Sequence, residues 1–146
     1  HFQHILDDNA HENGILKPRD QCNKLILCTG QIYASLYKKR EECNITDTAI
    51  VRCEQLHPFH FQDMKECLDS YPNLKEIIWC QEEPLNAGAW QYIYPRLETV
   101  LSETQFHKDK KIRYTGRPPS ASVAAGNKTQ HDQEHNNLIN DAFKNM

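Results

Sequence analysis

From Lys24 onward the chain alternates short apolar runs with longer segments whose apolar residues have helical spacing. The apolar runs cover residues 25–28, 49–53, 77–80 and 112–114. Such alternation predicts the strands of a mostly parallel sheet that is covered on both faces. We therefore expect an α/β fold in three layers, with right-handed crossovers placing helices on both faces of one sheet.

Each apolar run is followed by a pattern that predicts a helix. The expected buried stripes are Ile32, Leu36 and Cys43; Phe61, Met64 and Leu68; Trp90, Ile93, Leu97 and Leu101; and Leu138, Ile139, Ala142 and Phe143. Pro95 lies within the third pattern and lacks a backbone N–H, so we expect a kink or a late start there.

Residues 1–23 differ in amino-acid composition from the rest of the chain. They are rich in Asp, Asn and His, with short apolar patches at residues 5–6 and 15–16. We expect a polar connecting arm with little core of its own, followed by a single domain over residues 24–146. Since the sequence starts with His1 and has no leader-like segment, we also expect a piece of a longer protein.

Charge and hydropathy narrow the range of partners. The 146 residues carry 17 Lys and Arg against 20 Asp and Glu, a net charge of −3, without a basic stripe of interleaved aromatics. This composition disfavours a nucleic-acid partner. Mean hydropathy is −0.78, and no apolar stretch approaches the ~20 residues of a membrane span, so a membrane partner is not expected either.

The six cysteines form no Cys-x-x-Cys pair. Cysteines at the ends of predicted buried strands usually behave as small hydrophobes, so we expect free thiols in a reducing compartment. The alternative is a metal site formed by Cys28, Cys53 and Cys80 at adjacent strand ends.

Polar residues follow the predicted strands and should meet at the carboxyl edge of the sheet, where ligands and partners of such folds bind. The residues that we assign to this edge are Glu54, Gln55, Gln81, Glu82, Glu83, Asn86, Arg113 and Arg117. They either form ion pairs within the sheet edge and across a domain interface or line a ligand or effector pocket. No nucleophile is paired with a base, so we assign no catalytic residue.

Other motifs favour structural roles. Gly30 follows the first predicted strand without the further glycines of a nucleotide-binding loop. We expect surface or capping roles for His57 and His60, and solvated positions for His131 and His135. The charged run at residues 38–42 indicates a solvated helix face. Ser120 and Ser122 lie in a small-residue loop without a nucleophile elbow.

Several strings resemble the C-terminal domain of 2-oxoglutarate dehydrogenases. They cover residues 49–59, 79–86, 88–90, 95–99 and 113–120, with Ala124-Ala125-Gly126 and His131 after them. The resemblance runs from about residue 25 to 143 and implies a fold like the C-terminal domain of transketolase. A related family that acts on 2-oxoadipate is the alternative.

The resemblance implies a thiamine diphosphate-dependent enzyme that decarboxylates 2-oxoglutarate and passes the succinyl group to a dihydrolipoamide succinyltransferase. In this family the cofactor and magnesium are bound by earlier domains of a homodimer. The Gly-Asp-Gly diphosphate motif does not occur in this sequence, so we expect a module that binds no cofactor and is inactive alone. The resemblance also implies acetyl-CoA or AMP as possible effectors, and a location in the mitochondrial matrix or, in bacteria, the cytoplasm.

Overall fold

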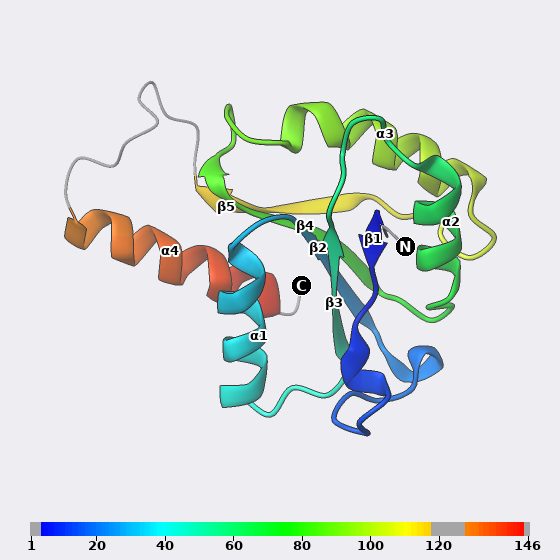
Figure 1. Cartoon of the computed structure of the whole chain (residues 1–146), viewed down its shortest axis with the longest axis horizontal. Helices are drawn as coiled ribbons and strands as arrows, with labels where there is room; N and C mark the ends of the chain where they lie inside the picture. The colour runs from blue at the N-terminus through cyan, green and yellow to red at the C-terminus, as the bar shows by residue number, and fades with distance from the viewer. Residues whose placement is uncertain (1–3, 118–127, 145–146) are drawn as a thin grey trace.

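The structure is a computed structural model that describes residues 4–117 and 128–144 (Figure 1). Its centre is a five-stranded sheet with the order β1-β3-β2-β4-β5. The strands are β1 (Ile5–Leu6), β2 (Lys24–Cys28), β3 (Thr48–Cys53), β4 (Glu76–Pro84) and β5 (Ile112–Arg117). Neighbouring strands from β2 to β5 pair in parallel, whereas β1 pairs antiparallel with β3.

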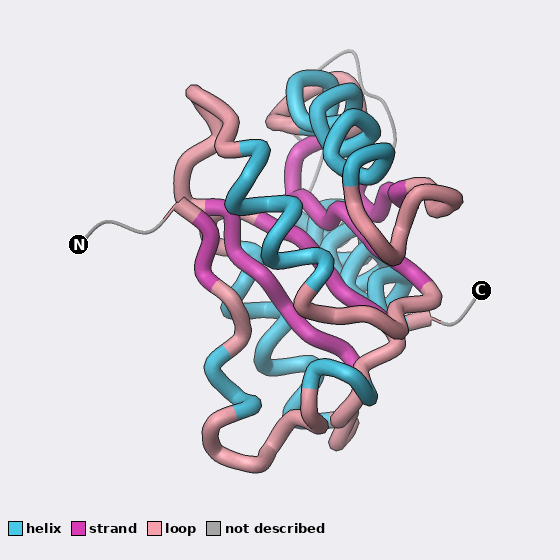
Figure 2. Tube along the Cα trace, turned by 90° about the vertical axis from the view of Figure 1, so that its right-hand side faces the viewer, coloured by secondary structure: helices cyan, strands magenta, loops and turns pink. Residues whose placement is uncertain are grey.

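Four helices cover the sheet on its two faces, which confirms the predicted layers. Helices α1 (Ile32–Glu42) and α4 (Lys128–Phe143) lie against one face, and α2 (Phe61–Asp69) and α3 (Trp90–Glu103) lie against the other (Figures 1 and 2). Side chains alternate along β2, so Leu25 and Leu27 pack towards α2 and α3, while Ile26 and Cys28 pack towards α1 and α4. The apolar runs are therefore continuous because both faces are buried.

Two strands extend further than the apolar runs predict. Strand β4 continues to Pro84 through an irregularity in its register, and β5 continues to Arg117. Pro84 lies opposite Arg117, and the Leu85 N–H donates to the Arg117 carbonyl at 3.0 Å. The prediction that these strands end with the apolar runs, at residues 80 and 114, was therefore wrong, because backbone pairing continues after the side chains turn polar.

The arm at residues 1–23 contributes more to the fold than its composition predicts. Its residues Ile5–Leu6 form the edge strand β1. Ala10, Leu16 and Cys22 are fully or almost fully buried in the core beneath α2 and α3. The expectation of little core in this segment is corrected, because a few well-placed apolar residues suffice to dock it.

A buried ion pair joins the arm to α1. The side chains of Asp8 and Arg40 are 0% and 2% exposed, respectively, and they form a salt bridge. Asp8 also accepts hydrogen bonds from the backbone N–H groups of Ala10 (3.0 Å) and Ile50 (2.9 Å), and Arg40 donates to the Thr48 carbonyl at 3.1 Å. The prediction of a uniformly solvated face at residues 38–42 was thus wrong at Arg40.

Helix α3 begins at Trp90, so Pro95 lies inside it and the expected late start is not observed. The closing helix α4 buries Leu138, Ile139 and Ala142 as predicted. All six cysteines are free thiols. Across the part of the chain that the structure describes, no helix combines the length and apolarity that spanning a membrane requires.

Candidate functional site

The residues predicted for the carboxyl edge form two groups there. Glu54 and Gln55 follow β3, whereas Gln81, Glu82, Glu83 and Arg117 belong to the ends of β4 and β5. Because β2 lies between β3 and β4, the two groups are about 10 Å apart across the sheet. The edge is therefore not one convergent cluster.

Gln81 is a structural hub. Its side chain is buried, and its Oε1 accepts hydrogen bonds from Trp79 Nε1 at 2.9 Å and from the Trp90 N–H at 3.1 Å. Its Nε2 donates to the carbonyls of Pro84 and Ala87 at 3.0 and 2.9 Å. These bonds hold the irregular end of β4 against the start of α3, and they leave the amide little capacity for a ligand.

Glu82 belongs to a short polar chain beside α1 and α4. Its Oε1 lies 3.3 Å from His135 Nδ1, and His135 Nε2 lies 3.2 Å from Ser35 Oγ. An open hollow of about 390 Å³ adjoins this chain, and its lining includes Lys38 and Lys39. Ser35 sits on a regular helix, not on the sharp strand-to-helix turn of a nucleophile elbow, so the arrangement does not support a serine nucleophile.

The two arginines of the prediction lie at opposite ends of β5. Arg117 is 8% exposed, and one of its terminal nitrogens lies 2.9 Å from His131 Nε2. Arg113 is at the amino end of the strand, where it pairs with Glu76 at 2.9 Å. Arg113 also donates to two carbonyls at the end of α4, those of Asp141 and Lys144, at 3.0 and 3.1 Å. Arg113 therefore does not belong to the carboxyl edge.

His131 is exposed, in agreement with the predicted solvated position, whereas His135 is partly buried and contacts Ser35 and Glu82. Each reaches the end of a neighbouring strand: His131 contacts Arg117 of β5, and His135 contacts Glu82 of β4. Their spacing of four residues puts them on one face of α4.

The remaining acidic and amide residues lie towards solvent. Glu54 is exposed and lies 3.8 Å from Arg52. Glu83, near the end of β4, and Asn86, in the segment between β4 and α3, are also exposed. A Cβ atom added to Gly88, whose φ is +71°, would approach the Glu83 Cβ to 2.9 Å, so this turn requires glycine. The exposed carboxylates at this rim of the sheet are therefore those of Glu54 and Glu83.

The three strand-end cysteines do not converge, which contradicts the cysteine metal hypothesis. Cys28 and Cys80 are neighbours in register and face α1 and α4, while Cys53 faces α2 and α3. Burial raises the pKa of Cys80 to about 11 and that of Cys53 to about 12, so both stay protonated at neutral pH. Side chains that point to opposite faces of a sheet cannot share one ion.

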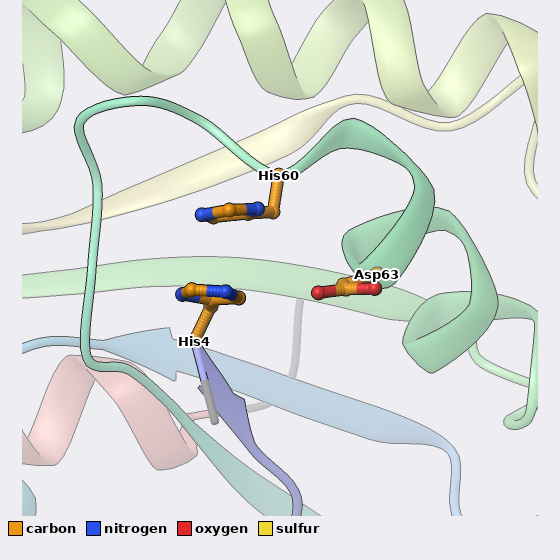
Figure 3. Close-up of side chains that lie close together, drawn as sticks. All are labelled: His4, His60 and Asp63. Carbon is orange, nitrogen blue, oxygen red and sulfur yellow. The ribbon is translucent and has the colours of Figure 1, made fainter. Parts of the chain in front are cut away.

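A group that sequence reasoning missed lies between the arm and α2. His4, His60 and Asp63 place ligand-type atoms within 4.8 Å of one another (Figure 3). The rings of His4 and His60 stack with centroids 3.4 Å apart and planes 11° apart. The sequence offers only the pair His60 and Asp63 as a local signal, because His4 arrives through the pairing of β1 with β3.

Comparison with known proteins identifies the family. Residues 1–143 match the family described as "2-oxoglutarate dehydrogenase C-terminal". The chain is 54% identical over 142 residues to the mitochondrial 2-oxoglutarate dehydrogenase of Schizosaccharomyces pombe and 48% identical over 143 residues to that of Saccharomyces cerevisiae. It is 39% identical over 128 residues to the 2-oxoglutarate dehydrogenase E1 component of Haemophilus influenzae.

These matches cover 97%, 98% and 88% of the chain, respectively, but only 14%, 14% and 13% of the relatives. The chain thus corresponds to a small part of proteins several times its length. The resemblance that the strings of residues 49–59 and 79–86 indicate is confirmed, and the α/β architecture agrees with it. This chain belongs to the 2-oxoglutarate dehydrogenase C-terminal family.

Proposed function

We propose that this chain is the non-catalytic C-terminal module of a 2-oxoglutarate dehydrogenase E1 component. The complete enzyme would decarboxylate 2-oxoglutarate oxidatively and succinylate the lipoyl group of a dihydrolipoamide succinyltransferase in the tricarboxylic acid cycle. The observation that carries the proposal is 54% identity over 97% of the chain to an enzyme of that name. The module would pack against the remaining domains of its own subunit within a homodimer.

The edge residues do not fit thiamine diphosphate with magnesium. A diphosphate needs cationic or N–H donors, but this rim exposes Glu54 and Glu83. Arg117 is turned towards His131, and Arg113 pairs with Glu76 at the other end of its strand. We therefore propose that the cofactor is bound entirely by domains outside this chain, and no reaction step is assigned to the residues described above.

The names of the relatives also suggest where the parent protein is located. Two of the three similar proteins described above are named as mitochondrial, and the third is a bacterial E1 component. We propose the mitochondrial matrix for a eukaryotic parent protein and the cytoplasm for a bacterial one. Free thiols at all six cysteines are compatible with either reducing compartment. The 2-oxoadipate alternative keeps the same module and changes only the substrate, which other domains would select.

A chimera tests the main proposal. The C-terminal segment of the Schizosaccharomyces pombe enzyme that aligns with this chain is replaced by this chain. We expect 2-oxoglutarate-dependent activity within about tenfold of the parent enzyme, equivalent to ~1.4 kcal/mol in activation free energy. An enzyme truncated at the same junction should lose activity, since the exposed domain faces would be unpaired. Activity with the lipoyl-bearing partner is the measurement, and gel filtration reports assembly.

The proposal fails if the chimera assembles as the parent enzyme does but has no activity with 2-oxoglutarate. Turnover of 2-oxoadipate in preference to 2-oxoglutarate would instead show that this module influences substrate choice, which the proposal denies.

A second candidate is an effector-binding module for acetyl-CoA or AMP. The hollow beside α1 and α4 favours it, because Lys38, Lys39 and His135 could meet a phosphate there. Under the main proposal, we expect no change in the melting temperature of the isolated chain at millimolar acetyl-CoA or AMP. A ligand at 100 times its Kd would add ~2.7 kcal/mol of stability, so a clear rise would favour the effector role. Lys38→Ala with Lys39→Ala should abolish any such rise.

A further inference from the structure

Three side chains from separate parts of the chain meet at one end of the sheet. His4 precedes β1, His60 is the residue just before α2, and Asp63 lies in the first turn of that helix. Figure 3 shows the two imidazole rings face to face with the Asp63 carboxylate beside them. Within residues 4–117 and 128–144, this is the one group of three His, Cys, Asp or Glu residues whose ligand atoms come this close.

The ring of His4 has a defined tautomer. The Gln55 amide donates through Nε2 to the His57 carbonyl at 3.1 Å, so its Oε1 is the end that faces His4. That oxygen lies 2.8 Å from His4 Nδ1, and an amide oxygen only accepts, so Nδ1 carries the proton. Nε2 is then the basic nitrogen of the ring. Histidines that bind metals characteristically donate their other ring N–H to such a partner.

The backbone of His4 is also fixed. Its carbonyl accepts hydrogen bonds from the N–H groups of Glu54 at 2.7 Å and Gln55 at 3.3 Å. The antiparallel pairing of Ile5 with Cys53 continues this register into the strand. His4 is therefore held beside the segment that leads to α2.

His60 has an unsatisfied ring nitrogen. Its Nε2 is buried and has no hydrogen-bond partner among the described residues. A buried polar atom without a partner is unfavourable. His60 makes no side-chain capping bond to α2, although it occupies the capping position. The predicted capping role is therefore not observed.

We propose that His4, His60 and Asp63 bind one divalent transition-metal ion of the zinc class. Two imidazoles and one carboxylate are three ligands of a tetrahedral zinc site, with the fourth position left to water or an outside ligand. Magnesium and calcium prefer sites made wholly of oxygen, so the two imidazoles select against them. This metal-site proposal does not rest on the proposed function of the parent enzyme.

Binding would open the stack of the two rings. A metal ion lies close to the plane of each imidazole that binds it, so parallel rings must tilt apart to share one ion. Zinc–nitrogen bonds of 2.0–2.1 Å place tetrahedral ligand atoms about 3.3 Å apart. The three ligand atoms now lie within 4.8 Å of one another, so they would have to come about an ångström closer together. The ion would then cross-link the N-terminal arm to α2 and thereby stabilise the pairing of β1 at the edge of the sheet.

Zinc titration of the chain tests the site. We expect one zinc ion per chain, measured by competition with a chromophoric chelator, and Co²⁺ should give the visible absorption of a tetrahedral site. His4→Ala and His60→Ala should each remove the binding. Gln55→Leu keeps all three ligands but loses the hydrogen bond to His4, and should weaken binding about 10–100-fold.

His57→Ala is the matched control, because His57 lies in the same loop, is exposed and contacts Tyr92 instead. It should bind zinc as the unaltered chain does. Melting temperatures measured without metal show whether each variant folds, and only the unaltered chain and the control should gain stability with zinc. The proposal is overturned if the chain binds no zinc at 100-micromolar order concentrations, or if the combined His4→Ala and His60→Ala variant binds it equally well.

Discussion

Arg40→Met should lower the free energy of unfolding by about 3–5 kcal/mol, because it leaves the carboxylate of Asp8 buried without its counter-charge. Asp8 is 0% exposed and would retain only the N–H groups of Ala10 and Ile50. The arm depends on this pair, since Asp8 links it to both α1 and β3. Urea denaturation followed by circular dichroism measures the loss.

Lys38→Met is the matched control, because it removes a positive charge from the same helix at a position that is 78% exposed. Its pair with Glu42 is long, at 4.0 Å, and open to solvent. We expect a change within about 0.5 kcal/mol. Combining Asp8→Asn with Arg40→Met should cost less than the sum of the two single variants, as for residues in direct contact. A loss below 1 kcal/mol in Arg40→Met would contradict the assignment.

Gln81→Leu should cost about 2–6 kcal/mol, because two or more buried groups lose their partner at about 1–3 kcal/mol each. Trp79 Nε1 would have no acceptor, and the carbonyls of Pro84 and Ala87 would lose their common donor. Leucine has nearly the size of glutamine, so the effect isolates hydrogen bonding from packing. Urea denaturation gives the energy.

The Trp79 indole N–H supplies a second measurement. In the unaltered chain it should exchange slowly with solvent, and in Gln81→Leu it should exchange much faster, as recorded by NMR. Glu82→Gln is the neighbouring control: Glu82 is 39% exposed and pairs only with His135 among its described contacts, so a change within about 1 kcal/mol is expected. Equal stability of Gln81→Leu and the unaltered chain would show that Gln81 is not the hub described above.

Arg40 and Gln81 are both buried, although their neighbours in the sequence indicate exposed positions. Arg40 lies in a run of five charged residues and is nevertheless buried, and Gln81 opens an apparently polar loop and is buried in a strand. In both cases a partner that is distant in the sequence determines that the side chain is buried. Composition within a window cannot contain that partner, because Asp8 comes from the arm and Trp90 from the following helix.

The same limit applies to predicting which candidate functional residues lie at the carboxyl edge of the sheet. The order of elements places Glu54 and Gln81–Glu83 at one end of the parallel strands, as the sequence predicts. Arg113 was assigned there because the apolar run of β5 stops at Tyr114, yet the strand runs on to Arg117 and leaves Arg113 at the other end. Of the two arginines that the sequence assigns to this edge, only Arg117 lies there, and it contacts His131.

What the sequence by itself determined is the set of elements, the three layers and the family, because doubly covered strands are continuously apolar and because the motif strings are specific. The tertiary structure alone decided the strand order, the docking of the arm through Asp8 and Arg40, and the meeting of His4 with His60. These features depend on contacts between residues far apart in the chain, and local periodicity carries no information about which distant side chain completes a hydrogen bond, an ion pair or a metal site.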